Sequence, residues 1–193
     1  NEFTIDFVNI SGATNPASGY GIVNNDYRMG TYEVTNEQWG KFKASNGTLT
    51  GSPSIAYDYD PYQGDNTEPY YSGTDLSVRY TSWYEAAQFV NYLNATTGHQ
   101  TAYKFTGTQG QGDYSLAVWE SEDVGYNPTN PFRNSNAHYF LPTEDEWVKA
   151  AYWNGTVMQM YANASPDDLV SGEPDPTKWK YEWHPSTHGS PFP

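Results

Sequence analysis

The chain has 193 residues, no cysteine and a formal net charge of −14, because 23 acidic residues outweigh nine lysines and arginines. This charge excludes nucleic acid and anionic membrane surfaces as partners, because too few cations are present to neutralise phosphates. The absence of cysteine excludes disulfides, thiolate metal sites and a cysteine nucleophile. No apolar run is long enough to span a bilayer, so we expect no membrane insertion. The chain begins with Asn1 and shows no signal peptide, so we expect a mature or trimmed product from which any export signal is already gone.

Aromatic residues make up 17% of the chain, with 18 tyrosines and seven tryptophans, whereas leucine, isoleucine and valine are scarce. This composition predicts a core built from a few large rings, with much of the tyrosine at the surface. Such tyrosines form either a rigid hydrogen-bonding surface or a recognition surface, since tyrosine provides contact area at low entropic cost. Composition alone leaves both interpretations open.

The N-terminal region predicts two strands followed by a helix. Apolar residues at positions 3, 5 and 7 alternate with polar ones, which indicates a half-buried strand, and Tyr27–Val34 reads as a second strand. Thr35 and Gln38 have the spacing of a reciprocal helix cap, and the rings of Trp39 and Phe42 fall on one face of the helix that follows. We expect this helix to end at the glycine at position 47.

The middle of the chain alternates between long loops and short elements. Residues 46–75 lack any hydrophobic period and predict an ordered acidic loop, whose glycine lies one position too late for an EF-hand. Ser82 and Glu85 begin a second helix that stops near Gly98. Ala102–Phe105 predicts a strand, and residues 107–138 predict a second irregular insertion.

The strongest local signal lies at residues 139–153. Pro142 disfavours helix in the residue before it, and Thr143 and Glu146 have the spacing of a third reciprocal cap. Helical periodicity places Trp147, Ala150, Ala151 and Asn154 on one face, which we predict to pack against the rest of the domain. Six prolines between residues 166 and 193 then predict loop structure to the end of the chain.

Three segments in this order resemble the formylglycine-generating-enzyme-like (sulfatase-modifying factor) family. They are YRMGTYEVTNEQW at 27–39, TSWYEA at 81–86 with NYL at 91–93, and YFLPTEDEWVKAA at 139–151. The resemblance implies one α+β domain over residues 1–193, with an irregular C-type-lectin-like fold of few helices, short antiparallel strands and much loop. Its long polar insertions are similar to those of secreted bacterial members.

Family members include copper-dependent and iron-dependent oxidases as well as ligand-displaying lectin-like proteins. The copper-binding cysteines of catalytic members lie in a C-terminal part that we expect to be absent from this chain. Four histidines are present, and the pair His184 and His188 is interrupted by Pro185, which breaks any helix that would bring both onto one face. No constellation in the chain demands catalysis, which favours a non-catalytic role and leaves the question of enzymatic activity open.

Three sets of residues are candidate sites. Calcium, which the family often holds after the third helix, suits the hard oxygen ligands of an acidic loop there. Exposed rings suit the apolar faces of sugars or a protein partner, and Asn-x-Ser/Thr sequons are candidate glycosylation sites. The predicted metal ligands are Asp167, Asp168, Glu173 and Asp175; the predicted ligand-binding residues are Tyr57, Tyr59, Tyr62, Trp179, Tyr181 and Trp183; the sequons begin at Asn9, Asn46, Asn94, Asn154 and Asn163.

Three functions remain compatible with the sequence. The first is a non-catalytic extracellular or cell-surface module that binds or displays a carbohydrate or protein ligand. The second is a structural subunit of a filament or surface assembly, in which copies of the chain exchange a strand or loop, because an unpaired sheet edge favours such pairing. The third is the N-terminal part of a metal-dependent oxidase.

Overall fold

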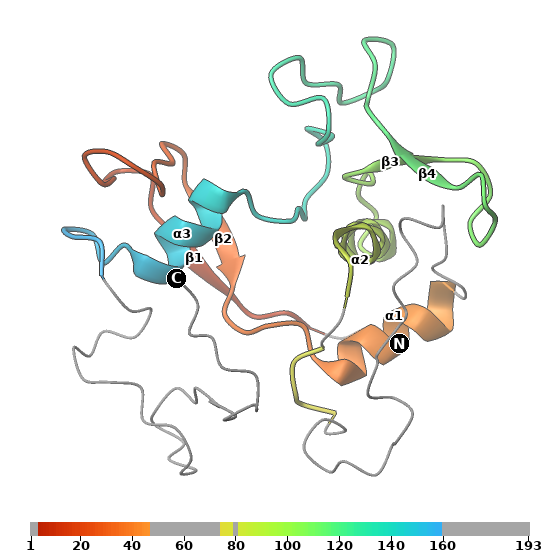
Figure 1. The fold of residues 1–193 in the computed structure, drawn as a ribbon, viewed down its shortest axis with the longest axis horizontal. Coiled ribbons are helices and arrows are strands. Elements are labelled where there is room, and N and C mark those ends of the chain that lie inside the picture. The colour runs from red at the N-terminus through yellow and green to blue at the C-terminus, as the bar shows by residue number, and fades with distance from the viewer. Residues whose placement is uncertain (1–3, 47–73, 79–80, 160–193) are drawn as a thin grey trace, which may run out of the picture. The chain divides into compact units, whose positions relative to one another are not determined.

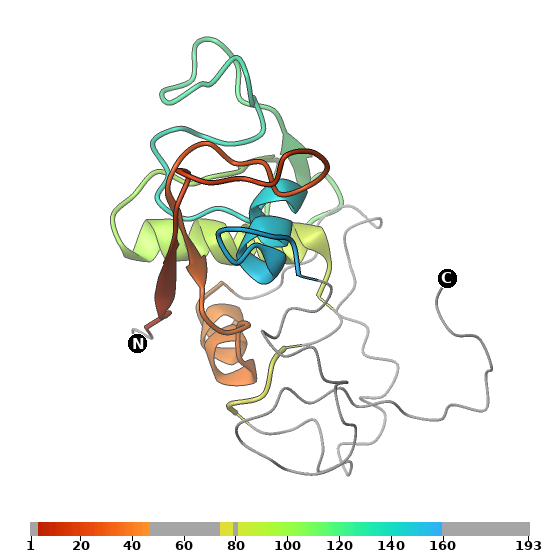
Figure 2. The same ribbon diagram turned by 90° about the vertical axis from the view of Figure 1, so that its left-hand side faces the viewer.

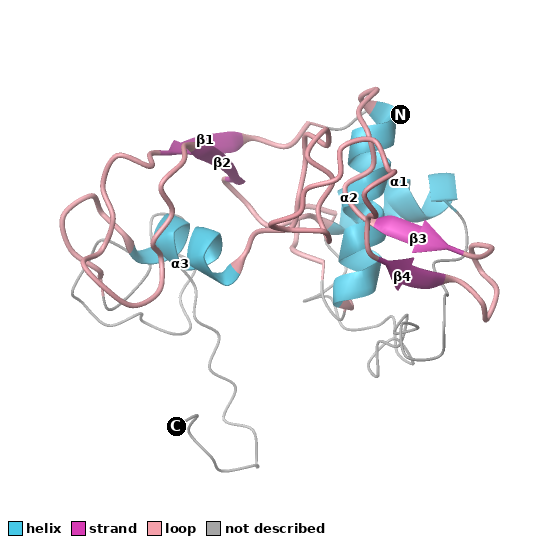
Figure 3. Ribbon diagram, turned by 90° about the horizontal axis from the view of Figure 1, so that it is seen from above, coloured by secondary structure: helices cyan, strands magenta, loops and turns pink. Residues whose placement is uncertain are grey.

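A computed structural model describes residues 4–46, 74–78 and 81–159 of the chain. In these residues the elements follow the order β1 (Phe7–Ile10), β2 (Tyr27–Gly30), α1 (Asn36–Asn46), α2 (Trp83–Thr96), β3 (Lys104–Thr106), β4 (Ser115–Ala117) and α3 (Glu144–Tyr152). Loops connect the helices and the short strands (Figures 1 and 3). The α+β class and the large share of loop are therefore as the sequence predicts.

The chain divides into two compact units. One comprises Asn1–Val8 and Arg28–Pro142, and the other comprises Asn9–Tyr27 and Thr143–Pro193. Strands β1 and β2 form one two-stranded sheet and lie side by side in Figure 2. The chain passes from one unit to the other within β1, after Val8, and returns within β2, after Tyr27. Each unit therefore contains segments that are distant in the sequence.

The predicted helix starts are confirmed in atomic detail. At α2, Ser82 Oγ accepts from the backbone N–H of Glu85 at 3.2 Å, and the Glu85 carboxylate accepts from the Ser82 N–H at 2.7 Å. At α3, Thr143 and Glu146 repeat this pair at 3.2 and 2.7 Å. Each pair satisfies two of the backbone N–H groups that a helix N-terminus leaves without partners.

The core of the larger unit consists of two clusters. Phe42 of α1 and Phe89 of α2 meet edge to face, with ring centroids 5.3 Å apart, and Trp39 stacks on Phe89 at 5.5 Å. The second cluster joins α2 to the β3–β4 hairpin and the segment before α3; its buried members are Ala87, Val90, Ala102 and Tyr103. Few aliphatic residues are needed because large rings fill the space, as the composition predicts.

The strand predictions need correction at their boundaries. Among the described residues, strand β1 begins at Phe7 and pairs with β2, whereas Phe3 of the predicted alternation lies outside the described residues. Strand β2 ends at Gly30 rather than at Val34. The carbonyl of Val34 accepts a hydrogen bond from the backbone N–H of Val78, outside the β1–β2 sheet. In the second insertion, β4 pairs antiparallel with β3 and matches Phe105 with Leu116, a hairpin for which the sequence gives no clear period.

The predicted packing face of α3 is only partly buried: Ala150 and Ala151 are half-buried, whereas Trp147 and Asn154 are exposed. The ring of Trp147 is 50% exposed, whereas the side chain of Lys149 is buried at 1% exposure. The partner segment offers polar atoms: Val23 O and Asn15 Oδ1 accept from Lys149 Nζ, and Gly21 N–H donates to Asp145 Oδ1 at 2.8 Å. Helical periodicity identifies which residues share a face, but it does not reveal that a face is matched to polar partners.

Candidate functional site

Asn94, near the end of α2, joins this helix to residues 138–139 and is completely buried. Its amide nitrogen donates to the carbonyls of Val90 and Tyr139 at 3.0 and 2.9 Å. Its amide oxygen accepts from the backbone N–H groups of His138 and Tyr139 at 2.8 and 3.0 Å. The side chain therefore uses both donors and both acceptor positions, and it fixes the loop that leads into α3.

This junction brings two histidines together at the surface. Backbone bonds hold both next to Asn94, since His99 donates its N–H to the Asn94 carbonyl at 2.8 Å. The imidazoles of His99 and His138 stack at a centroid separation of 4.7 Å and an angle of 14°. Arg28 of β2 completes the group with its Nη2 2.8 Å from His138 Nε2. We call Arg28, His99 and His138 the basic cluster.

The electrostatics of the basic cluster are unusual for so acidic a chain. All three side chains are exposed. The part of the chain described by the structure places no carboxylate in an ion pair with Arg28. Partial burial lowers the pKa of His138, and the positive charges of His99 and Arg28 lower it further. A guanidinium only donates, so Nε2 of His138 acts as acceptor and carries no proton in this arrangement.

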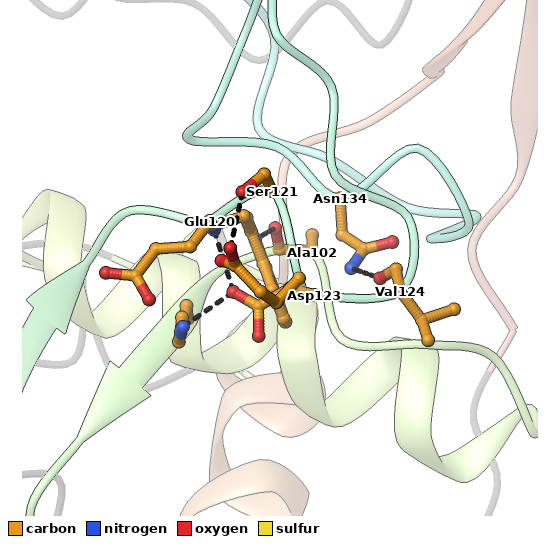
Figure 4. Close-up of polar contacts among 9 residues, drawn as sticks. Ala102, Glu120, Ser121, Asp123, Val124 and Asn134 are labelled. Carbon is orange, nitrogen blue, oxygen red and sulfur yellow. Dashed lines mark hydrogen bonds and ion pairs between the residues drawn. The ribbon is translucent and has the colours of Figure 1, made fainter.

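The loop between β4 and Asn134 is the second candidate region (Figure 4). Its Asp123 carboxylate pairs with Lys104 at 2.6 Å and accepts from the Glu120 N–H at 2.8 Å, and both contacts lower the pKa of Asp123. Buried Asn134 donates to the Val124 carbonyl at 2.7 Å, while its backbone N–H donates to Ala102 at 2.9 Å. The Asp123 carboxylate and the Asn134 amide are therefore occupied in holding this loop in shape.

Gly125 in this loop is required by its surroundings. Its φ is +81°, and a Cβ atom built there would lie 1.9 Å from Asn134 Oδ1. Any side chain would displace Asn134, and the backbone conformation is one that L-residues rarely adopt. Glycine therefore allows the loop to close against the buried amide.

Lys149 is the corresponding buried polar residue of the smaller unit. Its ammonium donates to Val23 O at 2.7 Å and to Asn15 Oδ1 at 2.8 Å, and Asn15 Oδ1 also accepts from the Val23 N–H at 2.8 Å. Burial lowers the pKa of Lys149, partly offset by the charge of Asp26. This geometry anchors the 15–23 segment to α3 and leaves the amine inaccessible to a ligand.

Most residues predicted from sequence as ligands lie outside the described residues. This holds for the calcium candidates, for all six aromatic ligand-binding candidates and for the sequon at Asn163. In the described residues, no group of three histidine, cysteine or carboxylate side chains is placed to hold a metal ion. The structure thus neither supports nor opposes the predicted calcium site.

The remaining sequons differ sharply in accessibility. Asn9 and Asn154 are exposed and Asn46 is half-buried, so their glycosylation stays a prediction. Asn94 is fully buried with its amide in four hydrogen bonds, and an attached glycan is incompatible with that arrangement. A sequon specifies only the acceptor sequence, whereas attachment requires the nitrogen to be exposed.

The sequence pattern revealed neither the junction role of Asn94, which it marked only as a sequon, nor the basic cluster. Asn94 follows a run of apolar helix positions and stands out only as a polar residue on an otherwise buried face, a weak signal. The histidines are 39 positions apart in the sequence, and Arg28 is further still, so no spacing rule joins them. Only the shared bonds to Asn94 place the histidine backbones together.

The family of the chain follows from comparison with protein-family models. A family model, the sulfatase-modifying factor enzyme 1-like domain, matches residues 3–189. The chain belongs to this family. Neither the comparison with curated proteins nor that with solved structures finds a match. In this family member, the segment YFLPTEDEWVKAA at 139–151 contains the reciprocal cap of α3 and all of the helix except Tyr152.

Proposed function

We propose that this member of the family is a non-catalytic module that binds or displays a ligand outside the cell or at its surface. The observation that carries the proposal is that the buried polar side chains form hydrogen bonds to the protein's own backbone. Asn94, Asn134 and Lys149 each bind loop backbone, and Glu85 caps a helix. Such groups stabilise a scaffold for long loops rather than aim a reactive atom at a substrate.

The ligand class follows from the loops that this scaffold would support. Their tyrosines and tryptophans suit the apolar face of a sugar or the surface of a protein. The test is a binding screen of the full chain against neutral glycans and candidate protein ligands, followed by alanine variants at Tyr59 and Trp179. The matched control is Tyr32→Ala, since Tyr32 is a tyrosine with a 77% exposed ring in the described region.

Loss of binding in either loop variant, with Tyr32→Ala unchanged, supports the proposal. Unchanged binding in both loop variants would contradict the assignment of the ligand to these rings. Light scattering during the same experiments separates the alternatives: a monomer that binds supports a binding module, whereas polymers that persist on dilution favour a subunit assembled by strand exchange. Copper or iron retained after purification, measured by elemental analysis, would favour an oxidase.

Calcium is the cofactor that we propose, on Asp167, Asp168, Glu173 and Asp175. Binding to the folded state alone raises stability in proportion to the logarithm of the ligand concentration. The melting midpoint of the full chain should therefore fall when calcium is chelated and recover when calcium, but not magnesium, is restored. An unchanged midpoint in chelator contradicts a structural calcium ion.

A further inference from the structure

We propose that the basic cluster is a binding site for a single oxyanion, a carboxylate or sulfate group on an otherwise neutral ligand, and that this site fills as the pH falls. The inference rests on the proposed binding function and names a chemical group for its ligand. The anion site does not depend on the aromatic ligand-binding candidates, because it consists of Arg28, His99 and His138, which all lie among the described residues.

The first argument is the arrangement of charge. The guanidinium of Arg28 points its Nη2 at a neutral imidazole nitrogen 2.8 Å away, and no carboxylate of the described residues forms an ion pair with it. Among the described residues, Glu37 forms an ion pair with Lys41 and Asp123 forms one with Lys104. Arg28 is held in this position by the ring of Phe7, over which the guanidinium lies at 5.2 Å. A positioned, exposed cation without a carboxylate partner is suited to an external anion.

The second argument is the proton balance. When His138 is protonated, its Nε2 becomes a donor and faces the guanidinium donor, so the Arg28–His138 hydrogen bond is lost. The two cations then repel one another, and the stacked imidazole of His99 lies at 4.7 Å from His138. An oxyanion between Arg28 and His138 accepts from both and removes this repulsion. Anion binding should therefore be coupled to uptake of one proton.

The groups that face His138 support this coupling. From β2 comes Arg28, from the end of α2 comes His99, and from its own segment comes the ring of Tyr139, which meets it edge to face at 4.8 Å. The charged groups that act on the pKa of His138 are His99 and Arg28, and both lower it. A bound anion would reverse this effect and raise the pKa.

The net charge of the chain limits how much negative charge the ligand can carry. A chain of −14 repels polyanions at long range, so that a heavily charged polymer would be excluded even if the site accepted one of its groups. A single anionic group on a neutral ligand meets little of this repulsion. Carboxylate and sulfate share this chemistry, and separate titrations distinguish them.

The experiment titrates sodium sulfate, and separately sodium acetate, into the full chain at constant ionic strength with chloride as the balancing anion. The readouts are the imidazole proton signals of His99 and His138 and the proton uptake from calorimetry in two buffers of different ionisation heat. We expect saturable shifts of both histidines and affinity about tenfold higher at about pH 5.5 than at about pH 7.5, because one proton is taken up. Saturation by acetate alone assigns a carboxylate ligand, and saturation by sulfate alone assigns a sulfate.

Variants make the test specific. Arg28→Gln should abolish saturation, whereas Lys41→Gln, which removes the same charge from the Lys41–Glu37 pair of α1, should leave it intact. His138→Gln keeps an acceptor for Arg28 but cannot be protonated, so its anion affinity should lose its pH dependence. Equal weakening by Arg28→Gln and Lys41→Gln, or binding without proton uptake, overturns the proposal.

Failure of this site and failure of the proposed function are distinguishable. A chain that binds its ligand through Tyr59 or Trp179 but ignores sulfate and acetate refutes the anion site alone. A chain that takes up sulfate at the histidines but binds no glycan or protein retains the anion site and loses the proposed function.

Discussion

Asn94 and Lys149 are fully buried polar residues in two different units, and both tie a helix to loop backbone. Asn94 does so as a neutral amide with four hydrogen bonds: its nitrogen donates two and its oxygen accepts two. Lys149 does so as an amine whose burial lowers its pKa. A neutral group loses only its hydrogen bonds to water on burial, whereas a charged one also loses its favourable hydration.

This difference has a consequence for substitution. Removing Asn94 leaves several buried backbone groups unpaired and gains nothing in return. Removing Lys149 takes one donor from Val23 O and one from Asn15 Oδ1, which keeps the Val23 N–H, and it also removes the cost of burying a cation, as when buried ion pairs are replaced by apolar residues. The larger unit should therefore depend more strongly on its amide than the smaller unit depends on its amine.

The largest effect is expected for Asn94→Ala. It strips partners from Tyr139 O and from the N–H groups of His138 and Tyr139, each costing about 1–3 kcal/mol, and a total loss of about 3–5 kcal/mol follows after partial relaxation. Urea unfolding followed by tryptophan fluorescence measures this change. The control is Asn154→Ala, an exposed asparagine whose side chain accepts only from its own turn. If Asn94→Ala lowered the free energy of unfolding no more than Asn154→Ala does, the assignment of Asn94 as a stabilising junction would be contradicted.

Lys149→Met should destabilise less, by about 1–2 kcal/mol, because the lost hydrogen bonds to Val23 O and Asn15 are partly offset by the removed desolvation cost. The lowered pKa of Lys149 adds a test by pH. Between the folded pKa and the usual lysine value the unfolded state binds more protons, so stability should rise with pH in the wild type relative to Lys149→Met. A loss exceeding that of Asn94→Ala would reverse the comparison.

Tyr27→Phe tests the other polar contact of α3. The Tyr27 hydroxyl donates to the Glu146 carbonyl at 2.6 Å, and its removal should cost about 1 kcal/mol near neutral pH. Burial and the charge of Glu146 raise the pKa of Tyr27 to about 12, so its contribution is present below the unfolded value and is lost as pH rises towards 12. Unfolding curves of both proteins should converge over that range; parallel curves would contradict the assignment.

The smallest effect is expected at the basic cluster. The pKa of His138 is lowered in the folded state, so the unfolded state binds the proton first and wild-type stability should fall as pH is lowered through this window. His138→Gln should remove part of that fall, which melting midpoints between about pH 7.5 and about pH 5 would detect. Addition of sulfate should restore wild-type stability at the acidic end but not that of Arg28→Gln. A wild-type midpoint independent of pH would contradict the lowered pKa.

Much of the scaffold could be predicted from sequence because its signals are local. A serine or threonine three residues before a glutamate or glutamine reaches only its own helix turn, and Thr35, Ser82 and Thr143 all begin helices as predicted. The aromatic packing of Phe42 and Phe89 follows from helical spacing and composition. The β4 strand and the burial of Lys149 were missed because each depends on a distant partner that no local pattern specifies.

The sequence by itself determined the family, the helix starts and the ring-rich core, since each depends on residues within about one helical turn or on overall composition. Tertiary structure alone decided that Asn94 is a buried junction, and that Arg28, His99 and His138 meet. Hydrogen bonds between segments far apart in the chain select these neighbours, and the energy of such a contact is absent until the fold brings both partners together.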